Sequence, residues 1–300
     1  MSNIAQDDAI IRPPAIGIRI WNSTSRILHK LADEPLGMMG FIILAILVVV
    51  AIFAPLIAPY DPAAQTLSDA LQAPSLAHLA GTDEFGRDIF SRLVHGTRIT
   101  IQTVLSVSVI VGPIGLVIGV VAGFFGGRTD AILMRATDIV LSFPSLILAL
   151  AFAAALGAGL GTAIVAISLT AWPPIARLAR AEALVVRNAD YVAAARLYGA
   201  SPLRILFLYI APMCIPSVIV RLTLNMAGII LTAASLGFLG LGAQPPLPEW
   251  GAMISSGRKF MLDYWWVAVM PGLAILLTSL AFNIAGDTLR DLLDPRHARS

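Results

Sequence analysis

The sequence predicts an all-α membrane protein with six transmembrane helices. Hydrophobic residues make up 58% of the 300-residue chain and charged residues only 13%, which does not suit the surface of a soluble domain. The apolar residues form long uncharged stretches, several of them longer than the roughly 20 residues that a helix needs to cross a bilayer. Most of the Lys and Arg residues fall in alternate connecting segments, as expected for a chain that crosses the membrane repeatedly.

The first two spans are predicted at residues 38–57 and 99–125, which are uncharged throughout. A mostly polar segment of about 35 residues precedes the first span, so this span is expected to be retained and not cleaved as a signal peptide. Four basic residues lie in this segment: Arg12, Arg19, Arg26 and Lys30.

The remaining four spans come from two overlong stretches and one ordinary one. Residues 139–176 are uncharged over almost twice the length of one crossing, so they are expected to fold back at the glycines of 157–161 as spans three and four. Residues 205–241 contain two prolines, which predicts a short surface helix at 205–211 and a fifth span at 215–236. The sixth span is predicted at 264–285.

The distribution of basic residues predicts that both termini are cytoplasmic. Fourteen of the 20 Lys and Arg residues fall on the side of the termini, five on the opposite side, and Arg221 inside a span. Basic loops resist translocation, so the richer side is assigned to the cytoplasm. The resulting plan has four parts: a cytoplasmic tail at 1–35, the first span and an external loop at 36–98, a five-helix core at 99–290, and a cytoplasmic tail at 291–300.

The external loop approaches the second span through a charged segment at 81–92. Thr82 or Asp83 is expected to cap a helix whose Ile89, Phe90 and Leu93 face the membrane. This pattern favours an interfacial helix, as a charged and capped entry into the second span, over a binding site.

The cytoplasmic segment 177–209 is too helix-prone and too long to be an unstructured connection. Asn188 or Asp190 is expected to cap a helix at 191–198, which Gly199 ends, and Ser201 with Pro202 begins the next helix. The first helix carries Ala193, Ala194 and Ala195 beside Arg196. Composition alone leaves two interpretations open: a small-residue docking surface for another protein, or a helix that lies passively on the membrane.

These residues resemble the inner-membrane permease subunits of ABC importers, specifically the second permease of the dipeptide, oligopeptide and nickel group. Such permeases carry Glu-Ala-Ala, three residues, a Gly and a downstream Pro, where this chain has Ala193-Ala194-Ala195, Gly199 and Pro212. Ala193 replaces the usual Glu, so an acidic contact is missing. Further matching motifs are Gly81-Thr-Asp, Gly86-Arg-Asp-Ile-Phe-Ser-Arg92, the stretch 234–251 and the stretch 286–296.

The resemblance implies the architecture of a type I ABC importer permease. It implies that the chain forms half of a path for di- or oligopeptides, with nickel chelates, glutathione or another small solute as alternatives. The implied partners are a homologous permease subunit, two ATPase subunits or domains, an external substrate-binding protein and lipid. The resemblance makes 177–211 an ATPase-coupling loop, and we assign nine residues to the contact: Asp190, Tyr191, Ala193, Ala194, Ala195, Arg196, Gly199, Ser201 and Pro212.

Two further groups are candidates for contact with solute or partners. Arg221 and Asn225 are candidates for the translocation path because charge inside a span is costly and usually faces protein or water, although Arg221 can also extend to the headgroups. Gln244, Glu249 and Trp250 lie in an external segment that the resemblance implies meets the binding protein. Trp250, Trp265 and Trp266 also suit anchoring at the membrane interface.

Enzymatic functions are not indicated. The four histidines lack metal-ligand spacing, and the glycine-rich stretches 157–161 and 237–242 lack the Lys-Ser/Thr of a phosphate-binding loop. We therefore expect no bound cofactor, with ATP and magnesium on the partner subunits. A net charge of +2 also disfavours nucleic-acid binding. The rival function, a self-sufficient secondary transporter or channel, is disfavoured because the spans lack mid-membrane acidic or His residues and repeated halves.

Overall fold

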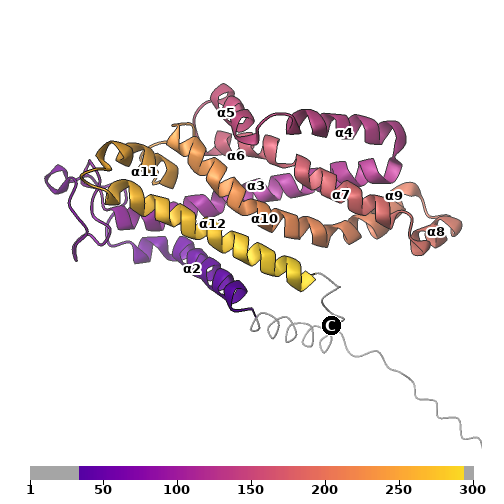
Figure 1. The fold of residues 1–300 in the computed structure, drawn as a ribbon, viewed down its shortest axis with the longest axis horizontal. Coiled ribbons are helices and arrows are strands. Elements are labelled where there is room, and N and C mark those ends of the chain that lie inside the picture. The colour runs from indigo at the N-terminus through magenta and orange to yellow at the C-terminus, as the bar shows by residue number, and fades with distance from the viewer. Residues whose placement is uncertain (1–33, 294–300) are drawn as a thin grey trace, which may run out of the picture.

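The computed structural model describes residues 34–293, and that part of the chain is built from helices with one isolated β-bridge between Thr82 and Asp88. Five helices are long and apolar enough to cross a membrane, and a bent pair makes a sixth candidate, in agreement with the predicted six spans. The helices run along the long axis of an elongated bundle (Figure 1). The terminal tails, with their basic residues, lie outside the described residues.

The first predicted span corresponds to α2 (Pro35–Ile57). Its buried residues are all small: Gly37, Gly40, Ala51 and Ala54. Gly37 and Gly40 lie against Thr288 and Ile284 of α12 (Trp266–Leu293), where an added Cβ would come within 2.3 Å and 2.8 Å of those side chains. The glycines therefore let α2 approach α12 closely, while the larger apolar side chains of α2 face outward.

The second predicted span is part of a longer helix, α3 (Ile89–Phe125). The predicted charged and capped entry into span two is confirmed, but the predicted capping residue is wrong: Asp88, and not Thr82 or Asp83, caps α3 by accepting a hydrogen bond from Ser91 N at 2.7 Å. Ile89 is fully buried instead of facing the membrane. The first turns of α3 are thus held inside the protein by the external loop.

The most extensive contact between two helices of the described residues lies between α3 and α7 (Pro173–Val186). Three glycines of α3 at four-residue spacing, Gly115, Gly119 and Gly123, face this contact. A Cβ at Gly119 would lie 2.3 Å from the carbonyl oxygen of Ala176 and 2.6 Å from Ala179 Cβ. The two helix backbones approach so closely that only glycine fits there.

The predicted hairpin of spans three and four turns where expected, but its first arm is bent. α5 (Ser145–Leu156) and α6 (Leu160–Ala171) are joined through Gly157, which has a φ of +91°. α5 is preceded by α4 (Gly127–Leu141), and the two meet at an angle of 88°. The predicted third span, which begins at residue 139, is therefore interrupted, because Pro144 lies in the short break and cannot continue a helix from the preceding turn.

The segment from residue 177 was predicted to be helical, and its first helix begins slightly earlier, at Pro173. α6 continues almost directly into α7, and together they form one candidate span, Leu160–Val186. Arg177 and Arg180 thus lie on a helix, as predicted for this helix-prone segment, and that helix packs against α3. The charges of Arg177 and Arg180 indicated a polar segment. The small residues on the other side of α7 are nevertheless buried: Ala176, Ala179 and Ala183.

The fifth span also begins earlier than predicted. α9 (Pro202–Ile205), a π-helical turn (Leu206–Ile210) and α10 (Ala211–Phe238) follow one another without a break. The predicted helix at 205–211 is not a separate element but part of this stretch, with Ile205, Leu206 and Ile210 buried and Phe207 and Leu208 exposed. Pro212 lacks the N–H of a regular helix, and the wider π-helical turn lies directly before it.

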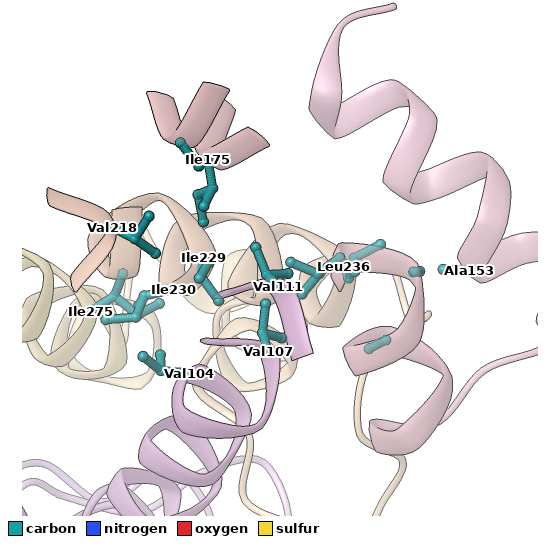
Figure 2. Packing of buried hydrophobic residues seen from close by; sticks show 14 of the residues in the cluster. Val104, Val107, Val111, Ala153, Ile175, Val218, Ile229, Ile230, Leu236 and Ile275 are labelled. Carbon is teal, nitrogen blue, oxygen red and sulfur yellow. The ribbon is translucent and has the colours of Figure 1, made fainter. Parts of the chain in front are cut away.

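The apolar core joins the long helices to each other. Figure 2 shows Val104, Val107 and Val111 of α3 beside Ile229 and Ile230 of α10. Ile175 of α7 and Ile275 of α12 belong to the same cluster. The sixth predicted span is confirmed as α12. The cluster also includes residues of α5, α6 and α11, so the core joins long and short helices alike.

Candidate functional site

The segment assigned to ATPase coupling forms one end of the bundle, opposite residues 58–88 and α11 (Trp250–Gly257) (Figure 1). It contains α8 (Asp190–Leu197) and α9. The predicted side-chain cap of α8 is wrong: Ala189 occupies the N-cap position, Asp190 begins the helix, and the Asn188 side chain donates to Leu184 O at 3.0 Å. The acidic Asp190 in the first turn still complements the helix dipole.

The end of α8 and the start of α9 are formed as predicted. Gly199 adopts a φ of +80°, which places it in the left-handed region that favours glycine after a helix. Ser201 caps α9, since its side chain accepts a hydrogen bond from Arg204 N at 3.4 Å, and Pro202 occupies the first turn. Pro212 is exposed in the first turn of α10.

The side chains of α8 divide into a buried face and an exposed tip. Val192 is fully buried and Ala195 is 8% exposed, so Ala195 packs inside the protein and is not available to a partner in this structure. Ala194 is half-buried, while Asp190, Tyr191, Ala193 and Arg196 are exposed. The tip consists of Leu197, 89% exposed, and Tyr198, 92% exposed, with Leu203 of α9 61% exposed beyond the turn.

The exposed Leu197 and Tyr198 were not among the predicted contact residues, which centred on the alanines. The available signal was a Leu-Tyr pair directly before a helix-ending glycine in a helix otherwise rich in Ala. Large apolar side chains that are almost fully exposed at the end of a well-packed bundle mark an interaction surface more strongly than alanines do. The guanidinium carbon of Arg196 lies 6.0 Å from the ring centroid of Phe124, so α8 also contacts the end of α3.

The path candidates Arg221 and Asn225 lie on one face of α10. Arg221 is exposed and takes part in none of the ion pairs formed within residues 34–293. A Cβ added at Gly228 would meet only Asn225 Oδ1, at 3.7 Å, so this face is open. Exposed or half-buried polar and small residues recur along it at spacings of three or four: Ser217, Arg221, Asn225, Gly228, Thr232 and Ser235.

The residues predicted to contact a binding protein make hydrogen bonds within this chain: Gln244, Glu249 and Trp250. Trp250 is 2% exposed and donates from Nε1 to Leu93 O at 3.2 Å, so both the anchoring and the surface-contact interpretations of Trp250 are contradicted by its burial. Trp266 is buried too, whereas Trp265 is exposed as an interfacial residue would be. The exposed Gln244 donates from Nε2 to Gly240 O and Gly242 O at 3.0 Å and 2.9 Å.

Glu249 holds the external segment to the end of α10. Its carboxylate caps α11 by accepting hydrogen bonds from Gly251 N at 2.9 Å and Ala252 N at 2.7 Å. Burial raises the pKa of this carboxyl, and the two backbone donors oppose that rise. Gly237 leaves the necessary room, because a Cβ there would lie 1.8 Å from Glu249 Oε2. Much of the 234–251 motif therefore serves to maintain the fold.

The other external motif, 81–92, is also architectural. Asp83 Oδ2 accepts a hydrogen bond from Arg87 Nε at 2.6 Å, and both side chains are largely buried. Arg92 reaches back to Pro62 O at 2.8 Å. Gly86 has a φ of +72°, and a Cβ there would lie 1.9 Å from Thr66 O. The charged motif therefore closes the external loop onto the start of α3.

The described fold is that of a multi-pass helical membrane permease. It resembles the permease chain in an inward-facing structure of the MetNI methionine ABC transporter, with a TM-score of 0.56 and 22% identity over 69% of this chain and 98% of that chain. At this identity the likeness shows the fold alone.

The chain belongs to the family of inner-membrane components of binding-protein-dependent transport systems, whose model matches residues 115–299. The N-terminal transmembrane domain of oligopeptide transport permease C matches residues 24–74. These matches confirm the resemblance seen in the sequence and make the chain a multi-pass inner-membrane protein.

Among the relatives is a probable D,D-dipeptide transport system permease of Escherichia coli (strain K12), 46% identical over 91% of this chain and 91% of the relative. A dipeptide transport system permease of the same organism is 48% identical over 87% of this chain and 89% of the relative. A di/tripeptide transport system permease of Pseudomonas aeruginosa (strain UCBPP-PA14) is 46% identical over 86% and 87%.

Proposed function

We propose that this chain is the permease subunit of an ATP-driven importer and forms half of the translocation path for di- or oligopeptides. The observation that carries the proposal is the exposed apolar tip of Leu197, Tyr198 and Leu203 at one end of a membrane bundle of this family. Such a tip suits burial in a groove of a separate ATPase subunit, which would bind ATP and magnesium. The names of the relatives support peptides as the transported solute.

The path is proposed to run along the polar face of α10, between this subunit and a homologous permease. Arg221 and Asn225 lie one helical turn apart on that face. Charged and polar side chains in a membrane-spanning helix are stabilised when they face protein or water. A hydrated solute path between two permeases would supply both protein and water. An external substrate-binding protein would deliver the peptide to the opposite end from the tip.

Transport is tested in vesicles that contain this chain with its paired permease, two ATPase subunits and the binding protein. We expect uptake of a labelled dipeptide only when ATP is supplied on the ATPase side. Vesicles that hold this chain alone are the control and are expected to take up nothing under a proton or sodium gradient. Gradient-driven uptake by the chain alone would overturn the importer proposal in favour of a secondary transporter.

The proposed orientation puts α8 in the cytoplasm and the external loop outside. The test replaces the buried Cys214 with Ser and introduces single cysteines at Ala73 or Ala193, both exposed alanines. On intact cells whose outer face is accessible, an impermeant thiol reagent is expected to label Ala73→Cys at once and Ala193→Cys only after permeabilisation. The reverse pattern would invert the proposed topology.

A further inference from the structure

α4 is attached to α7 by two ion pairs that come from distant parts of the chain. Arg180 binds Asp130 with both ends of its guanidinium group, Nε to Oδ1 at 2.5 Å and Nη2 to Oδ2 at 2.6 Å. Arg177 Nη2 lies 2.6 Å from Asp138 Oδ1. The pairing order shows that the two helices run antiparallel, with the early part of α4 against the later part of α7.

The two ion pairs differ in how exposed they are to solvent. The side chains of Arg177 and Asp138 are 54% and 55% exposed, whereas those of Arg180 and Asp130 are 33% and 20% exposed. Solvent weakens an exposed pair, and a bidentate Arg–carboxylate contact has the geometry that gives an ion pair its strength and direction. Arg180 with Asp130 is therefore the principal link.

Apolar packing contributes little to the attachment of α4. Thr137 is its one buried residue, and large side chains such as Ile132 and Ile139 point outward, 68% and 57% exposed. By contrast, α7 is packed against α3 through the close glycine contacts, and Arg187 at its end donates to Gly123 O at 2.8 Å. A rigid helix pair thus holds a loosely packed helix through ionic contacts.

This link connects the candidate ATPase surface to the bent arm of the hairpin. α7 ends at Val186 and α8 begins at Asp190, so movement of α8 acts directly on α7. α4 ends at the 88° bend that leads into α5. On the basis of the proposed function, we propose that Asp130 and Arg180 are positioning residues, which make α4 and α5 follow α7 when the ATPase subunits move α8.

The test uses the reconstituted importer and measures peptide molecules imported per ATP hydrolysed. Asp130→Asn and Arg180→Gln are each expected to lower this ratio about tenfold, a typical size for coupling between distant sites, while the ATPase subunits still co-purify. Arg180→Lys keeps the positive charge but cannot form the two parallel hydrogen bonds of a guanidinium group. An intermediate ratio of peptide imported to ATP hydrolysed is therefore expected. The matched control is Asp138→Asn in the exposed pair, which is expected to leave the ratio nearly unchanged.

The exchange of the two charges separates a positioning role from a general loss of structure. Asp130→Arg combined with Arg180→Asp is expected to recover most of the ratio that the single changes lose. Normal ratios in both single variants, or a low ratio in the exchanged protein, would overturn the proposal. Failure of every variant to accumulate would also overturn it, because the pair would then be a folding contact. Loss of ATPase co-purification in the unmodified protein would instead contradict the proposed function.

Discussion

Changing Leu197 to Asp together with Tyr198 to Ser is expected to abolish co-purification of the ATPase subunits while the permease remains inserted and folded. Both side chains are about nine-tenths exposed, so the change removes almost no packing within this chain. In a partner groove the same side chains would be central anchors, each contributing about 2 kcal/mol or more, which corresponds to at least roughly 30-fold in affinity per residue. Affinity purification of the tagged permease measures the retained ATPase.

The matched control for this prediction is Leu262→Asp. Leu262 is 98% exposed and lies between α11 and α12 at the opposite end of the bundle, so it shares the exposure but not the location. ATPase retention at the wild-type level in the Leu197→Asp/Tyr198→Ser protein would exclude the tip as the docking surface. A bulky substitution at Ala195 is a poorer test, because Ala195 is buried and its change would disturb the fold first.

Gly119→Leu is expected to cause a large loss of stability. Even a Cβ at this position would lie 2.3 Å from Ala176 O, a backbone atom that cannot move unless the two helices separate. Overpacking of this kind costs about 1–3 kcal/mol or more, so we expect low yield and a lower thermal midpoint in detergent.

The control for the glycine prediction is Gly161→Leu on α6, where an added Cβ meets nothing within 4 Å. This variant is expected to keep the wild-type yield and midpoint, since leucine also favours helix over glycine. Equal midpoints for the two variants would show that the α3–α7 contact is not tightly packed in the membrane.

The spans were predictable because lipid imposes a simple length and composition rule on each of them. Residues 38–57 fall within α2, and the glycine turn at 157–161 coincides with the α5–α6 connection. Gly199 was predictable for a similar local reason, since a glycine after a short helix favours a left-handed turn. Local chemistry is sufficient wherever a feature depends on a few neighbouring residues.

The errors fall where contacts between distant segments override local patterns. Arg177 and Arg180 were placed at the start of a separate cytoplasmic segment, yet the glycines of α3 turn the other face of their helix, α7, into a close packing surface. Trp250 read as an interfacial or surface residue, but it is buried against the start of α3. Neither outcome is encoded in the adjacent sequence, because each depends on which helix lies opposite.

By itself, the sequence determined the class of this protein, the approximate spans and the family resemblance, because hydropathy, glycine turns and motif spacing act over short distances. Only the tertiary structure decided which residues are accessible at the proposed ATPase end and which are internal. It buried Ala195, exposed Leu197 and Tyr198, and joined Asp130 to Arg180 across 50 positions of the chain. The physical reason is that accessibility and ion pairing depend on the helix packing that brings distant residues together.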